Sequence, residues 1–157
     1  MGTITTPVNL DDFEDFKQPT DGNHSGNLQA VEFGPTKKGL DVGPDSDEYR
    51  EQFLLTIKLA DDDPDAPGLP MRYYIGWPVA ADKDVMWGTR TAYGSKIKTL
   101  KDALTAFGGP ESGAIDQKAV EKVFFRAIGK KCKVKIKTSA RKDTGELQAG
   151  IDGLFPA

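Results

Sequence analysis

Alternating apolar and polar positions predict β-strands towards both ends of the chain. Over residues 51–60, apolar side chains stand at every second position. Successive side chains of a strand point to opposite faces, so this spacing is typical of a half-buried strand. Alternating or turn-bounded apolar runs predict further strands over residues 28–33, 71–79, 130–140 and 146–155.

Two segments in the middle of the chain have the spacing of helices. Thr99, with Asp102 three residues later, predicts a capped start for the first helix, and Gly108 predicts its end. Asp116 predicts the N-cap of the second helix, and Gly129 predicts its end. The apolar stripes consist of Leu100, Ala103, Leu104 and Phe107 in the first helix, and of Val120, Val123, Phe124 and Ala127 or Ile128 in the second.

The resulting element order is three strands, a helical insertion and two strands. This is the order of the OB-fold, a five-stranded Greek-key barrel with its helix between the third and fourth strands, although other small α+β domains share it. We therefore predict a mainly β chain with short helices, in which residues 26–157 form an OB-fold barrel. Residues 1–25 are polar and acidic, and we expect this segment to be flexible unless it docks on the barrel.

The net charge of −3 conceals an asymmetric distribution. Residues 86–142 contain 14 Lys and Arg against 4 Asp and Glu, whereas the rest of the chain contains 7 against 20. Binding to a polyanion depends on the local potential rather than on the total charge. The basic region therefore favours a nucleic-acid partner. The competing interpretation is that acidic and basic elements only keep different faces of the molecule soluble.

The fourth predicted strand carries the densest positive charge, because lysine fills every second position from 131 to 137. An exposed edge strand often carries lysine to block aggregation, but one or two lysines suffice for that purpose. Four lysines on one face, with two more cations in the following turn, favour a track for phosphates. The residues of this predicted track are Lys131, Lys133, Lys135, Lys137, Arg141 and Lys142.

Aromatic side chains accompany the basic region. Proteins that bind single strands without sequence preference combine a basic groove with aromatic platforms on which bases stack. Tyr74 and Arg72 have the opposite parity to the apolar positions of their strand, so they face away from the core. Trp87 and Tyr93 lie in a predicted loop, where packing and base stacking are equally plausible. The predicted contacts of this region are Arg72, Tyr74, Trp87, Arg90, Tyr93, Lys96 and Lys98.

The chain offers few candidates for catalysis or for binding a metal. His24 is the only histidine, and its Gly/Asn/Ser surroundings predict an exposed turn. Cys132 falls on the apolar face of its strand, where we expect a small buried hydrophobe. The acidic run over residues 61–65 lacks EF-hand spacing, so we expect a solvated loop. We predict no catalytic residue, no cofactor and no metal, and regard a nuclease as the weakest alternative.

Length and composition place the chain in a broad class. A chain of 157 residues is about one domain. No apolar run approaches the roughly 20 residues that span a bilayer, and the first residues do not have the pattern of a signal peptide. A single cysteine forms no internal disulfide. We expect a soluble cytoplasmic protein that does not bind membranes.

The segment AIGKKCKVKIKTSARKDTGELQAGIDGLFPA resembles the end of phage-encoded single-stranded DNA-binding proteins from replication and recombination cassettes. GNLQAVEFGPTKKG is similar to their opening strand, and TLKDALTAFGG to their helix, so the resemblance covers about residues 20–157. It implies an OB-fold, sequence-independent binding of single-stranded DNA in the host cytoplasm, no catalysis and frequent oligomerisation. Many such proteins recruit replication proteins through an acidic, aromatic-ended tail. This chain has DGLFPA there, so its acidic N-terminal segment with Phe13 and Phe16 is our candidate for that role.

A second function class remains open at this stage. The basic face of a structural or protein-interaction domain would bind another protein, or would pair with the acidic loops of a second copy. This alternative predicts oligomers without DNA, whereas the first predicts a complex with an oligonucleotide. Recombination or replication proteins remain candidate partners in both cases.

Overall fold

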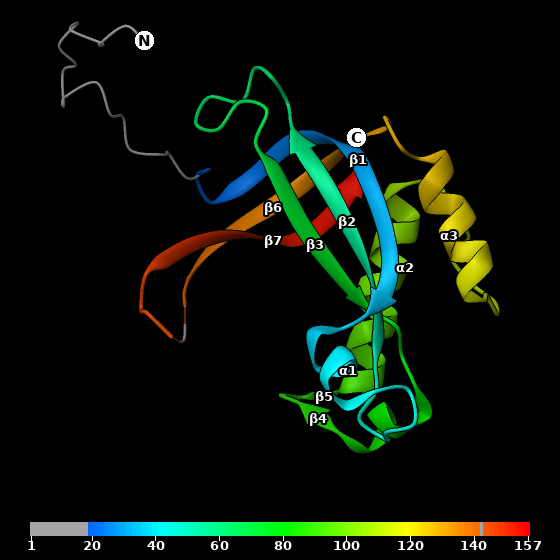
Figure 1. Cartoon of the computed structure of the whole chain (residues 1–157). Coiled ribbons are helices and arrows are strands. Elements are labelled where there is room, and N and C mark those ends of the chain that lie inside the picture. Colours follow the sequence, from blue (N-terminus) through cyan, green and yellow to red (C-terminus); the bar gives the residue numbers. More distant parts are fainter. Residues whose placement is uncertain (1–18, 142) are drawn as a thin grey trace, which may run out of the picture.

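The computed structural model of the chain describes residues 19–141 and 143–157. Its main element is a five-stranded antiparallel sheet with the strand order β3-β2-β1-β6-β7 (Figure 1). The mainly β prediction and the number of long strands are confirmed. The strands are β1 (Gly22–Pro35), β2 (Glu51–Leu59), β3 (Pro70–Gly76), β6 (Lys131–Ala140) and β7 (Leu147–Pro156).

β1 is the central strand and is longer than predicted. Its first residues, from Gly22 to Asn27, pair with β6, and the part from Gly26 to Pro35 pairs with β2. The β1–β2 register shifts between Leu28 and Ala30, just after the ladder to β6 ends at Asn27. This shift marks a β-bulge, and bulges bend a strand. The sheet thus begins four residues before the predicted domain start. Residues 1–18, which include Phe13 and Phe16 and most of the predicted flexible segment, lie outside the described residues.

The sheet is not closed into a hydrogen-bonded barrel. β3 and β7 are its two edges, and no ladder joins them in the part of the chain that the structure describes. Figure 1 shows β3 crossing β7 rather than running beside it along its length. A cleft of about 750 Å³ lies between residues 69–74 and residues 148–151. The predicted barrel closure is therefore absent, whereas the predicted position of the helices between the third and fourth long strands is confirmed.

The first helix of the insertion begins eight residues earlier than predicted. α2 spans Ala92–Ala106, and its N-cap is Thr91, whose side chain accepts a hydrogen bond from the Gly94 N–H at 3.0 Å. Thr99 lies inside the helix and donates to the Ser95 carbonyl. Glycine and serine are poor helix formers, so the first turn of α2 has no helical pattern in the sequence.

The second helix of the insertion, α3 (Gln117–Arg126), begins as predicted, because the Asp116 side chain accepts from the Ala119 N–H at 2.8 Å. Both helices close the core from one side. The Phe124 ring of α3 stacks edge-on against Phe53 of β2 and Phe107 beyond α2. None of the described helices is long and apolar enough to cross a membrane.

Three short elements lie in segments for which no helix or strand was predicted. α1 (Lys37–Val42) lies between β1 and β2, and Thr36 caps it by accepting from the Gly39 N–H. The 3₁₀ helix η2 (Ala80–Asp84) follows β3. A two-stranded hairpin then joins β4 (Met86–Trp87) to β5 (Arg90–Thr91), and Gly88 supplies the positive φ of its turn.

The core contains the alternate apolar positions that the pattern predicted. From Phe53 to Leu59 in β2 and from Cys132 to Ile136 in β6, every second side chain is buried and its neighbours are not. Tyr73 and Trp77 of the third-strand region are half-buried against this core, as expected for their parity. The largest fully buried side chains are Phe53, Phe124, Leu28, Leu55, Ile57, Leu59, Ile75, Ile136, Leu154, Val120 and Val134.

Candidate nucleic-acid interface

Four lysines of β6 form an exposed row, which we call the lysine face: Lys131, Lys133, Lys135 and Lys137. The alternating side chains Cys132, Val134 and Ile136 are at most 1% exposed. β6 is hydrogen-bonded to β1 on one side and to β7 on the other, so it is not an edge strand. Protection of a bare edge therefore does not explain the lysines.

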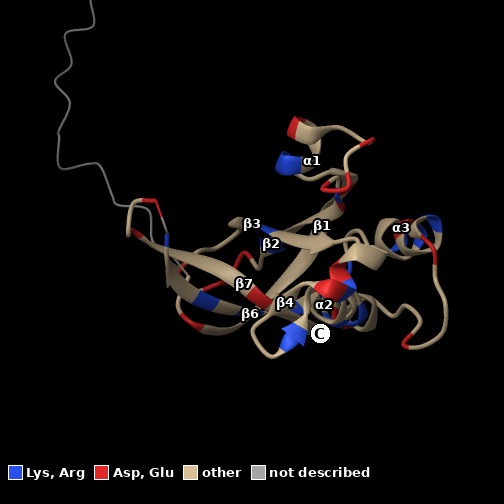
Figure 2. Ribbon diagram, turned by 90° about the horizontal axis from the view of Figure 1, so that it is seen from below, with Lys and Arg blue, Asp and Glu red and all other residues tan. Residues whose placement is uncertain are grey.

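The neighbours of the lysine face on both adjoining strands are small or uncharged. Asn23, Ser25 and Asn27 of β1 stand opposite Lys135, Lys133 and Lys131. On β7 the residues opposite Lys133, Lys135 and Lys137 are Phe155, Gly153 and Gly150. Among the described residues, the one ion pair of the four lysines joins Lys135 Nζ to Asp152 at 3.9 Å, and both partners are about half exposed. Figure 2 shows the lysine segments of β6 in blue on the sheet. Further carboxylates lie near the row, because Asp61 and Asp62 line a hollow together with Lys131 and Lys133, and Asp21 interacts electrostatically with Lys137. The positive charge is thus only partly compensated.

Phe155 is a candidate site residue that the sequence analysis missed. Its side chain is 45% exposed and lies across Gly153, where an added Cβ would stand 3.3 Å from two ring atoms. Glycine at this position therefore lets the ring lie on the sheet. Phe155 was counted as the last apolar residue of a strand. Its parity was the available signal, because it differs from that of the buried Leu154.

Tyr74 and Trp87 come together in one hollow of about 370 Å³, which we call the aromatic hollow. Tyr74 comes from the outer side of β3 and Trp87 from β4, and each is about half exposed. Sequence reasoning predicted both as stacking residues without placing them side by side. The other lining residues are Thr36, Lys38, Glu48, Arg50, Glu51, Gln52, Gly76, Ser95, Lys96 and Thr99.

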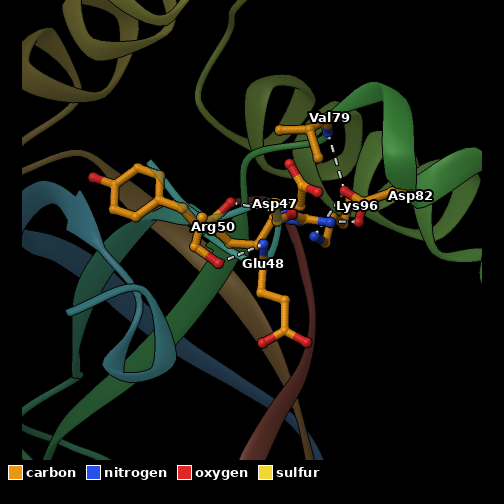
Figure 3. Close-up of polar contacts among 8 residues, drawn as sticks. Asp47, Glu48, Arg50, Val79, Asp82 and Lys96 are labelled. Carbon is orange, nitrogen blue, oxygen red and sulfur yellow. Dashed lines mark hydrogen bonds and ion pairs between the residues drawn. The ribbon is translucent and has the colours of Figure 1, made fainter. Parts of the chain in front are cut away.

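A buried carboxylate organises the cations of the aromatic hollow. Asp82 of η2 is 4% exposed and binds Lys96 Nζ at 2.9 Å and Arg50 Nε at 3.2 Å, while the Val79 N–H donates to it at 3.0 Å (Figure 3). Burial alone would raise the pKa of Asp82, but these three donors outweigh burial and hold the pKa below 3.8.

Lys96 consequently has a different role from the predicted phosphate contact. Its side chain is 11% exposed, and its charge is neutralised by Asp82. The Lys96 ammonium lies over the Trp87 ring, 5.6 Å from the ring centre, which is cation–π distance. Lys96 thus fixes one side of an aromatic platform instead of standing free in solvent.

The remaining predicted residues fall into three groups. Arg72 is exposed beside Tyr74, and both line the cleft between β3 and β7. Arg90 is exposed and pairs with Trp87 across the β4–β5 hairpin. The other predicted residues have partners or lie elsewhere: Tyr93 lies under Lys83, Lys98 pairs with Asp102, Arg141 pairs with Asp143, and Lys142 lies outside the described residues.

The cleft between β3 and β7 has lining residues in common with the aromatic hollow and with the ladder that carries the lysine face. Tyr74 lines both the hollow and the β3–β7 cleft, so the two adjoin at this side chain. Gly150 lines the far wall of the cleft and pairs with Lys137 across the β6–β7 ladder. The cleft thus adjoins the hollow at Tyr74 and the lysine face at the Gly150–Lys137 pair.

His24 and Asp63 were misplaced by the sequence analysis. His24, expected in an exposed turn, is 8% exposed within β1, and Asp63 of the supposedly solvated acidic run is equally buried. Their side chains meet at 2.6 Å, and His24 Nε2 lies 2.7 Å from the Thr20 carbonyl. The pair fastens the start of β1 to the β2–β3 loop. Cys132 is buried as predicted, and burial raises the pKa of its thiol to about 11.

No known protein-family model matches the chain, and no curated protein matches it. The lysine face, Phe155 and the aromatic hollow are therefore the features of the molecule that bear on its function. Together they offer cations for phosphates and exposed rings for bases, which is the combination that single-strand binders use.

Proposed function

We propose that the chain binds single-stranded DNA without sequence preference along its phosphate backbone and without catalysis. The lysine face carries this proposal. Four exposed cations stand in one row on a strand that is paired on both sides, and one exposed carboxylate offsets them within ion-pair distance in the described part of the chain. Like charges repel, so such a row is best explained by an anionic ligand that lies over it.

Exposed aromatic rings favour a single strand over a duplex. Phe155 stands beside Lys133 on the lysine face, and Tyr74 and Trp87 line the aromatic hollow. The flat faces of bases are covered by stacking inside a duplex, whereas a single strand can offer them to protein rings. Duplex DNA would use the lysines but would leave these rings without a partner.

We further propose that the sheet is a partly open OB-fold. The strand order β3-β2-β1-β6-β7 and the helices between β3 and β6 support this fold, because the OB-fold is a Greek-key barrel that is partly open. The resemblance of the C-terminal segment to phage single-stranded DNA-binding proteins supports a role in viral DNA replication or recombination in the host cytoplasm. Replication and recombination proteins are the proposed partners, together with other copies of the chain.

A titration of a fluorescent oligo-dT with the full chain tests the function. Counterion release predicts tight binding at low salt and a steep fall in affinity as salt rises. Duplex DNA of the same length should compete poorly, and an RNA competitor measures the preference for deoxyribose. Absence of binding at low salt, or an affinity that does not change with salt, would refute the proposal.

A protein-interaction domain is the second candidate. Phe125 and Ile128, near the end of α3, are 49% and 43% exposed. Exposed large apolar side chains of this kind mark many protein contacts. The mass of the chain in solution, measured with and without oligonucleotide, separates the two functions. An oligomer that ignores the oligonucleotide supports this candidate, whereas a mass increase by bound oligonucleotide supports the first.

A further inference from the structure

The cations of the aromatic hollow are ion-paired, in contrast to most of those of the lysine face. Arg50 and Lys96 both contact Asp82, and Lys38 Nζ lies 3.4 Å from Glu48. Each cation that lines the hollow therefore already has a carboxylate partner. A phosphate would have to displace one of these carboxylates. The hollow is thus poorly suited to a phosphate.

The walls of the hollow suit a flat, uncharged ring. Tyr74 and Trp87 reach it from different strands, and half of each side chain remains exposed to a ligand. Aromatic walls bind planar groups by stacking, which is worth about 1–3 kcal/mol for a nucleobase. The volume of about 370 Å³ is within the range of small-molecule sites.

Glu51 adds a feature that distinguishes one base from another. It is the first residue of β2, is half-buried and lines the hollow, and burial together with its nearby carboxylate raises the pKa of the Tyr49 hydroxyl. An ionised carboxylate only accepts hydrogen bonds and has about four acceptor positions, so capacity remains for a donor from a ligand. Glutamate is the residue type that accepts from the amino group of cytosine. Thymine has a carbonyl at the corresponding position.

We propose that the aromatic hollow takes one nucleobase and that Glu51 selects a base with an exocyclic amino group, cytosine rather than thymine. This proposal rests on the proposed function, because a DNA strand bound at the lysine face is what brings a base to the hollow. It adds base preference at one position to a binding mode that is otherwise independent of sequence.

Free nucleosides test the hollow without the phosphates. We expect 2′-deoxycytidine to quench tryptophan fluorescence of the full chain in a saturable manner, with little change between low and moderate salt. Thymidine, the matched pyrimidine, should bind about fivefold or more weakly. Trp87→Phe should abolish the signal, because Trp77 packs beside Phe53 in the core. Equal affinity for the two nucleosides, or an unchanged signal in Trp87→Phe, would overturn the proposal.

Oligonucleotides of dC and dT then test the role of Glu51. The wild type should prefer oligo-dC, and Glu51→Gln should bring the two affinities to within about twofold. Glu32→Gln is the matched control, since it removes the same charge from an exposed side chain of β1 that does not line the hollow. A preference that survives in Glu51→Gln, or that is lost in Glu32→Gln alone, contradicts the assignment.

The two proposals fail in different ways. Salt-dependent binding of oligo-dT without any preference for dC refutes the base pocket and leaves the proposed function intact. Binding of deoxycytidine without binding of any oligonucleotide refutes the proposed function and leaves the pocket. The nucleoside comparison uses the wild-type chain, so it remains decisive even if Glu51→Gln fails to fold.

Discussion

Phe155 stands directly opposite Lys133 across the β6–β7 ladder. Residues that face each other in an antiparallel pair share one side of the sheet, so an exposed ring and an exposed ammonium lie next to each other on the lysine face. One nucleotide presents both a flat base and a charged phosphate. The Phe155–Lys133 pair therefore matches the two parts of a single nucleotide.

Replacing Phe155 should weaken single-strand binding without changing its salt dependence. Phe155→Ala removes a base-stacking surface worth about 1–3 kcal/mol, so the Kd for oligo-dT should rise by roughly 5- to 150-fold. The number of phosphate contacts is unchanged, so the slope of log K against log salt should stay the same. Fluorescence anisotropy at several salt concentrations measures both quantities. Phe125→Ala, which removes a similarly exposed ring from α3, should leave the Kd unchanged.

Replacing two lysines of the lysine face should change the salt dependence itself. Each lost phosphate contact reduces the slope by about 0.7 for a single strand, so Lys133→Ala with Lys135→Ala should make it shallower by about 1.4. The same anisotropy titration gives this slope. Lys118→Ala with Lys122→Ala removes two exposed cations from α3 and should have no such effect. An unchanged slope in a folded Lys133/Lys135 variant would exclude these lysines as phosphate contacts.

Strand periodicity predicted the part of the site that depends on local pattern. The lysine face follows from alternation alone, because side-chain direction in a strand is fixed by parity. Tyr74 was assigned to the outer face for the same reason. By contrast, the pairing of β6 on both sides depends on which strands meet in space. No local sequence pattern predicts that β6 is paired on both sides, and this pairing is what excludes edge protection as the purpose of the lysines.

Contacts between distant segments account for the incorrect predictions. Lys96 was expected in solvent, but Asp82 lies 14 residues away and becomes its partner through the fold of η2 against α2. His24 was expected in an exposed turn, but Asp63 is 39 residues away. A buried ion pair requires both members, and neither member alone has a sequence pattern that identifies the other.

Asp82 should be important for stability because it serves two cations. Asp82→Asn leaves Lys96 and Arg50 without a counter-charge, and removing one partner from a buried pair costs about 3–5 kcal/mol. We expect the free energy of unfolding, measured with urea, to fall by about 3 kcal/mol, the lower end of this range. The reason is that Arg50 keeps its hydrogen bonds to the Asp47 and Tyr49 carbonyls. Asp84→Asn, an exposed change in the same 3₁₀ helix, should cost little. Equal stability of the two variants would contradict the role of Asp82.

The His24–Asp63 pair should make stability depend on pH near neutrality. Both ring nitrogens face oxygen acceptors, Asp63 Oδ2 and the Thr20 carbonyl, so both are satisfied only when the ring carries two protons. Burial lowers the pKa of His24, but the two hydrogen bonds outweigh it and raise the pKa above 6.5. For Asp63 burial has the opposite effect and raises the pKa. The hydrogen bonds that Asp63 accepts from His24 and from two backbone N–H groups outweigh burial, so the pKa of Asp63 is lowered.

The free energy of unfolding, measured with urea at a series of pH values, should have a plateau and should fall on the acidic and on the neutral side of it. The raised pKa of His24 stabilises the fold fully below pH 6.5, and this contribution is lost as pH rises through the folded pKa. The lowered pKa of Asp63 contributes above pH 3.8 and is lost as pH falls through its folded value. His24 is the only histidine, so His24→Gln should flatten the neutral side and cost about 2 kcal/mol at pH 6. Asp62→Asn, an exposed change in the same loop, should preserve the whole pH profile. A loss of stability towards neutral pH that persists in His24→Gln would disprove this assignment.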